Sequence, residues 1–155
     1  MGISVVVPSG WDARIAAAAD PDDAGRDGPG EFHPFLHAAT VPLPRQRGHY
    51  GGGVVELLGH DDAFVALVEF GAEALGSTLF AAHGAPRRFR AEEFSPSAVQ
   101  RMIRGHLGRQ AFFTTSGRPF CCFVVLGGNL ARRDRLGELN ALLESIGVSP
   151  ARIAE

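Results

Sequence analysis

Apolar side chains recur at every second position in several short stretches of the chain, a period that is typical of β-strands. These stretches are residues 3–7, 35–41, 62–70, 110–115 and 119–126. Residues 11–19 would form a further strand or an alanine-rich helical turn, and residues 54–58 a helical turn or the end of a strand. Ser116-Gly117-Arg118 separates the last two strands, which predicts a β-hairpin.

The predicted strands 62–70 and 119–126 are apolar on both sides. In the second of them, Phe120 and Cys122 point to one face, and Cys121 and Phe123 to the other. A strand of this kind lies at the centre of a sheet covered on both faces, or it presents one face to a dimer partner. The pattern alone favours neither alternative.

Two stretches have the pattern of a helix. From Asn129, taken as the capping residue, to Gly147 an apolar stripe follows the helical period. Its members are Leu136, Leu139, Leu142, Leu143 and Ile146. Ser95-Pro96 is typical of a helix start and predicts a short helix over 95–104, although Val99 and Ile103 would also suit a strand.

Taken together, the elements predict an α+β protein. We expect a mainly antiparallel, twisted sheet with the C-terminal helix packed on one face and one or two short helices besides. A length of 155 residues predicts one domain over 1–155. Residues 20–31 contain several glycines, two prolines and five acids, so we predict a mobile surface loop there.

Composition narrows the class of protein further. No apolar run approaches the roughly 18 residues that cross a bilayer, so we expect no membrane association. The first residues lack the basic segment of a signal peptide, and the two adjacent cysteines, Cys121 and Cys122, read as buried thiols. These features favour a cytoplasmic protein in a reducing compartment.

The net charge of −2 conceals a separation of charge along the chain. Residues 1–84 hold 4 Arg against 11 acids, whereas residues 85–135 hold 10 Arg against 3 acids. Within the basic region, Arg87, Arg88 and Arg90 are the candidate binding residues. They would meet an anionic partner, or pair with Glu92, Glu93 or the acidic half of the chain. We expect no nucleic-acid partner, because duplex binding depends on many phosphate contacts and the net charge of the chain is close to neutral.

Recognised catalytic and metal-binding motifs are incomplete in this sequence. Residues 20–31 place acids at several positions of a calcium loop, but Ala24 has no oxygen ligand at the fifth. His33 and His37 have helical ligand spacing, but Pro34 favours a strand. Gly51-Gly52-Gly53 lacks the lysine of a phosphate-binding loop. We therefore predict no catalytic residue, no metal and no cofactor.

Both ends of the chain resemble the PsbP-like α/β/α sandwich fold. The resemblance rests on Val-Val-Val-Pro-Ser-Gly-Trp at 5–11, and on Gly-Arg-Pro-Phe-Cys-Cys-Phe-Val-Val-Leu-Gly at 117–127 followed by Asn-Ala-Leu-Leu-Glu-Ser-Ile at 140–146. The fold family includes a photosystem-associated protein, a Ran-binding import cofactor, mycobacterial lipoproteins and chaperone-like adaptors. Most of these are binding proteins, so the resemblance implies binding rather than catalysis.

Two hypotheses of function follow from these observations. The first is a non-catalytic module that binds another protein or forms a homodimer, because strands that are apolar on both sides need cover on both sides. The second is a protein or enzyme that uses arginines on the sheet face to bind a small anionic ligand, because residues 85–135 are strongly basic.

Overall fold

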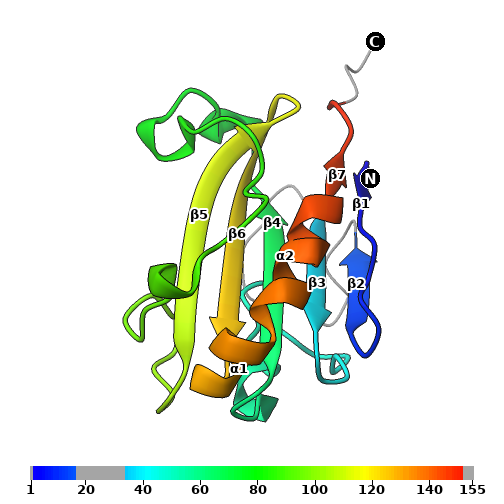
Figure 1. Cartoon of the computed structure of the whole chain (residues 1–155). Coiled ribbons are helices and arrows are strands. Elements are labelled where there is room, and N and C mark those ends of the chain that lie inside the picture. Colours follow the sequence, from blue (N-terminus) through cyan, green and yellow to red (C-terminus); the bar gives the residue numbers. More distant parts are fainter. Residues whose placement is uncertain (1, 17–33, 152–155) are drawn as a thin grey trace.

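A computed structural model describes residues 2–16 and 34–151 of the chain. Five antiparallel strands form the main sheet in the order β2-β3-β4-β6-β5 (Figure 1). Their bounds are Asp12–Ala16 (β2), Phe35–Ala39 (β3), Ala63–Glu69 (β4), Leu107–Thr115 (β5) and Arg118–Leu126 (β6). The predicted α+β class with a mainly antiparallel, twisted sheet is confirmed. The loop predicted at 20–31 lies outside the described residues.

Of the two alternatives for the strands that are apolar on both sides, the structure shows the position inside the sheet. Strands β5 and β6 form the predicted hairpin, in which Thr115 pairs with Arg118, although β5 starts three residues earlier than expected. The strands that are apolar on both sides, β4 and β6, are the inner neighbours whose register pairs Ala66 with Phe123. Their apolar side chains are buried by the layers that cover the two faces of the sheet.

The C-terminal helix packs on one face of the sheet, as predicted, but it consists of two helices (Figure 1). Helix α1 spans Asn129–Asp134 and α2 spans Leu136–Ser145, with a break at Arg135. Gly128, not Asn129, occupies the N-cap position, and no side chain caps it. The predicted stripe is confirmed, because Leu139, Leu142 and Leu143 are buried in the core between helix and sheet.

The opposite face of the sheet, here called the second face, is covered by the chain itself. Residues 41–58 pass over it and contribute Val54, Val55 and Leu58, with the 3₁₀ turn η2 at Val55–Leu57. Gly51 lies directly on Phe64: its φ is +90°, and a Cβ there would come within 2.5 Å of the ring. The glycine-rich stretch that reads as a surface bend is thus partly a core segment.

The N-terminal strand has a different partner from the one its position suggests. Strand β1, only Ile3–Ser4, pairs with β7, Gly147–Val148, in a separate two-stranded sheet. The turn at 8–10 is present, with Trp11 N–H donating to the carbonyl of Pro8, but β2 pairs with β3. Gly147 therefore does more than end the helix, because it begins the strand that holds the N-terminus.

The helix predicted over 95–104 is wrong. Ser95 instead forms an isolated antiparallel bridge with Gly108 of β5, through hydrogen bonds of 2.9 and 2.8 Å in the two directions. Its hydroxyl accepts from Ser97 N–H, which closes a turn rather than starting a helix. Between β4 and β5 the structured elements are short 3₁₀ turns: Ala72–Ala74 (η3), Thr78–Phe80 (η4) and Ala91–Glu93 (η5).

Candidate functional site

The three predicted binding arginines lie on one exposed stretch of chain. Residues 85–94, here called the crossing segment, leave the outer edge of β5 after a parallel bridge between His83 and Thr114. The segment passes in front of β5, on the same face of the sheet as α2, and returns to the β5 edge at Ser95 (Figure 1). Arg87, Arg88 and Arg90, here called the basic strip, are exposed along it.

The crossing segment has few secondary-structure hydrogen bonds, yet its backbone is fixed. The Asn140 side chain of α2 accepts from Phe89 N–H at 2.8 Å and donates to the Phe89 carbonyl at 3.0 Å. The Phe89 ring is buried in the core, edge-on to Phe94 at 6.0 Å. Because both backbone groups of Phe89 are hydrogen-bonded and its ring is buried, the backbone of the arginines on each side of it has a defined path.

Arg109 of β5 stabilises the crossing segment from below. Its guanidinium lies 5.2 Å from the centre of the Phe89 ring and 3.7 Å from a carboxylate oxygen of Glu93. Glu93 in turn accepts from Arg90 N–H at 2.6 Å and thereby caps η5. Glu93, one of the two acids next to the basic strip, is therefore engaged by Arg109 and by backbone instead of by the strip.

Charge is neutralised elsewhere in the basic region, but not at the strip. Three ion pairs join the region 85–135 to the acidic half of the chain, in the described residues: Arg101–Glu56, Arg118–Glu69 and Arg135–Asp61. Arg118 is the most buried of these, with hydrogen bonds of 2.8 and 2.6 Å to both Glu69 oxygens. Arg87, Arg88 and Arg90 have no acidic group within 4.0 Å in the described part of the chain.

A shallow, open depression of about 410 Å³ lies next to the crossing segment at the β5 edge. It is lined by Glu93, Ser97, Ala98, Val99, Arg109 and Gln110. Its charged groups, Arg109 and Glu93, already pair with each other. The depression therefore offers polar and backbone contacts rather than an unpaired charge.

Both cysteines and His37 are buried and withdrawn from reaction. Cys121 and Cys122 are fully buried on opposite faces of the sheet, and burial raises the pKa of each thiol to about 12. His37 is fully buried on the second face, and burial lowers its pKa to about 4. Its ring donates to the His49 carbonyl and accepts from Arg47, so both nitrogens are occupied.

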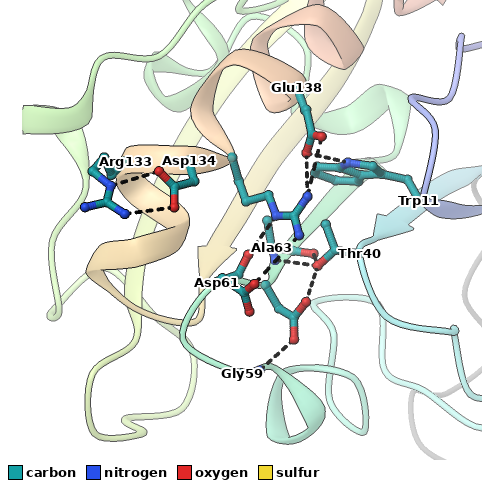
Figure 2. A network of polar contacts seen from close by, with 10 residues as sticks. Trp11, Thr40, Gly59, Asp61, Ala63, Arg133, Asp134 and Glu138 are labelled. Carbon is teal, nitrogen blue, oxygen red and sulfur yellow. Dashed lines mark hydrogen bonds and ion pairs between the residues drawn. The ribbon is translucent and has the colours of Figure 1, made fainter.

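The acids near the break between the two helices form a structural network (Figure 2). Arg135 donates to the Asp61 carbonyl and to Glu138, which also accepts from the Trp11 indole at 3.2 Å. Asp62 accepts from the Thr40 hydroxyl and from Gly59 N–H. These contacts attach the helices to the end of the sheet. Among the described residues, no group of three His, Cys, Asp or Glu side chains could hold a metal ion.

One buried polar atom has no hydrogen-bond partner in the described residues, namely Nδ1 of His106 at the start of β5. The His106 side chain is almost completely buried, and burial lowers its pKa. The direction of this shift follows from burial, which disfavours the charged form of the ring. This residue adds no reactive group to the basic strip.

The sequence identified the basic strip but not what holds it. Asn140 was missed, although it is a polar residue four positions after Leu136 and three before Leu143, on the core-facing stripe of a helix. A polar group at such a position needs a buried partner, and here the partner is the Phe89 backbone. The roles of Arg109 and Glu93 had no comparable signal, because they depend on how the crossing segment folds back.

Comparison with protein families, curated proteins and solved structures gave no match to this chain. No helix in the described residues is long and apolar enough to cross a membrane.

Proposed function

We propose that this protein is a non-catalytic binding module, an adaptor, that docks an acidic segment of another protein on the basic strip. The observation that carries the proposal is the state of Arg87, Arg88 and Arg90: they are exposed, without an acidic partner, on a backbone fixed by Asn140. A fixed backbone reduces the freedom that is lost on binding, and each guanidinium can bind a carboxylate with two parallel hydrogen bonds.

The buried titratable groups support a binding role over catalysis. A general base must reach the proton that it removes, and a nucleophile must be exposed and ionised. His37 is enclosed with both nitrogens bonded, and the two thiols are buried and protonated at neutral pH. The PsbP-like resemblance of the chain ends, which we propose as its fold family, points the same way, since most members are binding proteins.

A protein partner is favoured over single-stranded nucleic acid. The sequence Arg-Arg-Phe-Arg at 87–90 has the composition of a nucleic-acid site, in which an exposed aromatic ring stacks on a base. Here Phe89 is only 3% exposed, and no aromatic side chain is among the exposed large apolar residues of the described chain. The strip therefore offers charge without a stacking surface.

The other occupants considered for this protein fit less well. A homodimer formed through the sheet would need an open face, and in the described residues α2 and residues 41–58 cover the two faces. A small anionic ligand in the depression would meet Arg109, which Glu93 already neutralises. We propose that the protein is cytoplasmic, because its two cysteines are buried free thiols. We also propose a bacterial source, because all of its Lys and Arg positions are Arg.

The proposal can be tested with defined probes in a fluorescence binding assay at low ionic strength. We expect a labelled oligoglutamate peptide to bind, and the triple variant R87A/R88A/R90A to bind it about tenfold more weakly, since each of the three exposed charges contributes about 0.5 kcal/mol. The matched control R45A/R104A/R132A removes three other arginines without ion-pair partners in the described chain, and should bind normally.

Three results would overturn the proposal. The first is equal loss of peptide binding in the two triple variants, which would indicate only net charge. The second is tighter binding of a labelled oligouridine than of the peptide. The third is a thermal shift with small phosphorylated or carboxylated compounds that R109A abolishes and R87A/R88A/R90A does not.

A further inference from the structure

Strand β5 is an edge of the main sheet, and its outer side is paired only near its two ends. Near one end, Thr114 N–H donates to the Ala82 carbonyl and the Thr114 carbonyl accepts from Gly84 N–H. Near the other, Gly108 and Ser95 exchange both backbone hydrogen bonds. These two bridges are six residues apart along β5, which is about 20 Å of extended chain.

The backbone groups between the bridges are open. In an antiparallel strand, alternate residues direct both N–H and C=O to the same side, so Gln110 and Phe112 face outward like Gly108 and Thr114. The Gln110 carbonyl accepts from the Arg109 guanidinium. The N–H groups of Gln110 and Phe112, and the Phe112 carbonyl, have no hydrogen-bond partner in the described residues.

Space for another chain exists beside Gln110. The depression of about 410 Å³ lies at this edge, with Gln110 and Arg109 on one side and residues 97–99 on the other. The crossing segment does not occupy the edge, because it passes in front of β5 between the bridges (Figure 1). Open edge groups are a ready template for a further strand.

We propose that the acidic partner segment binds in extended form as a short additional strand on β5, between the Thr114 and Gly108 bridges. This inference rests on the proposed function and adds the conformation of the ligand. Backbone hydrogen bonds to Gln110 and Phe112 supply affinity, and carboxylates on the ligand pair with the basic strip on the neighbouring crossing segment. The length of the gap limits the paired part to about three or four residues.

The two bridges also argue against a second copy of this chain as the occupant. A sheet continued through two β5 strands would need the whole nine-residue edge, Leu107–Thr115, in both copies. In each copy the edge is blocked near both ends by residues 82–84 and 95. A short peptide fits between the bridges, whereas a second β5 does not.

The test uses a labelled peptide of alternating Glu and Val with the full-length protein. We expect its binding to slow amide hydrogen exchange at Gln110 and Phe112, as measured by NMR. An analogue with N-methylated central residues keeps the charge but cannot form the ladder, and should bind about tenfold more weakly. An analogue with Gln in place of Glu keeps the ladder and should lose affinity to a similar extent.

The outcomes separate this inference from the function on which it rests. If the N-methylated peptide binds as well as the parent, or if exchange at Gln110 and Phe112 is unchanged, strand addition is wrong, while charge-dependent docking on the strip stands. If R87A/R88A/R90A binds the parent peptide like the wild type, the proposed function fails as well. A dimer whose interface protects the same two amides without peptide would identify a second copy as the occupant.

Discussion

At the scale of single residues, His37 shows how burial fixes a protonation state. Its Nε2–H donates to the His49 carbonyl at 2.7 Å, and its Nδ1 accepts from Arg47 at 2.8 Å. A proton on Nδ1 would remove the acceptor and place two cations side by side inside the second face. Burial, more than Arg47, lowers the pKa of His37 to about 4.

This pKa predicts a loss of stability in mild acid. Between about pH 6.5 and pH 4 the unfolded chain binds a proton at His37 that the folded chain does not, so stability falls as the pH falls. A shift of this size corresponds to about 3 kcal/mol at pH 4, with no contribution above pH 7. Urea unfolding of H37Q across this range should show a pH dependence smaller by that amount.

The matched control is H83Q, which removes an exposed histidine and keeps the buried His37. His106, whose pKa is also lowered by burial, remains in both proteins and cancels in the comparison. If H37Q has the same pH dependence of unfolding free energy as the wild type, protonation of His37 does not destabilise the fold, and the prediction from its buried geometry is wrong.

Asn140 is the residue on which the shape of the basic strip depends. Replacement by Ala leaves the buried N–H and C=O of Phe89 without their side-chain partner. Each unsatisfied buried group costs about 1–3 kcal/mol, so we expect N140A to lose about 2–4 kcal/mol of unfolding free energy in urea. The exposed Asn129 provides the control, and N129A should change stability by less than about 0.5 kcal/mol.

N140A also tests how the strip is held. Amide exchange at Phe89 should become fast in this variant, because its acceptor is gone, while exchange within β6 remains slow. Unchanged protection at Phe89 would mean that packing of the ring alone fixes the crossing segment.

At the scale of elements, the spacing of apolar residues predicted the strands and the helix that are buried on one or both faces. The hairpin of β5 and β6, strand β4 and the leucine stripe of α2 all follow from the spacing of apolar residues. The helix expected over 95–104 is absent because Ser95 pairs with Gly108 instead of capping a helix. Gly108 lies later in the chain but next to Ser95 in space, so the local capping signal did not reveal this pairing. The same holds for the candidate site: the three arginines could be predicted from the sequence, whereas the contacts that position their backbone could not.

The segment that covers the second face, residues 41–58, was the part of the fold that the sequence predicted least well. Residues 45–53 contain four glycines and two arginines, a composition typical of a surface loop. The close approach of Gly51 to Phe64 explains the composition, because only a residue without Cβ fits at φ +90° against an aromatic ring. A glycine needed for contact cannot be told from one needed for a turn without the structure.

The neighbouring glycines give a prediction with an internal control. G51A places a Cβ within 2.5 Å of the Phe64 ring at an unfavourable φ, so we expect a loss of about 2–4 kcal/mol of unfolding free energy. G52A adds a methyl group to an exposed position with no atom closer than 3.9 Å, and should change stability by about 0.5 kcal/mol or less. Urea unfolding of both variants provides the measurement, and equal effects would mean that the loop does not pack on the sheet.

At the scale of the whole molecule, the arginines have two roles: some pair with acids within the fold, and those of the basic strip have no acidic partner in the described residues. Ion pairs such as Arg118–Glu69 connect the basic and acidic parts of the chain internally, and this part of the charge separation supports the fold. The basic strip is the part that remains unpaired. Exposed large apolar residues are spread over separate segments of the described chain: Val6, Val7, Leu57, Leu75, Leu79, Met102 and Leu130.

This division predicts that the isolated protein is a monomer. A stable homodimer usually buries a substantial apolar interface, and both faces of the sheet are already covered by α2 and by residues 41–58. Light scattering after size-exclusion chromatography at physiological salt should therefore give a mass of about one chain, 16.4 kDa. R87A/R88A/R90A should give the same mass, since the strip is expected to bind a different protein.

If the measured mass is larger than that of one chain, its dependence on salt concentration shows which kind of contact holds the copies together. Contacts between exposed charges weaken as the Debye length falls to about 3 Å at 1 M salt, whereas apolar contacts do not. A dimer that dissociates in high salt and in R87A/R88A/R90A would show that the basic strip docks on the acidic half of a second copy. A dimer that persists in both conditions would contradict the intramolecular cover of the sheet, because it would need an apolar interface that the exposed side chains of the described residues do not provide.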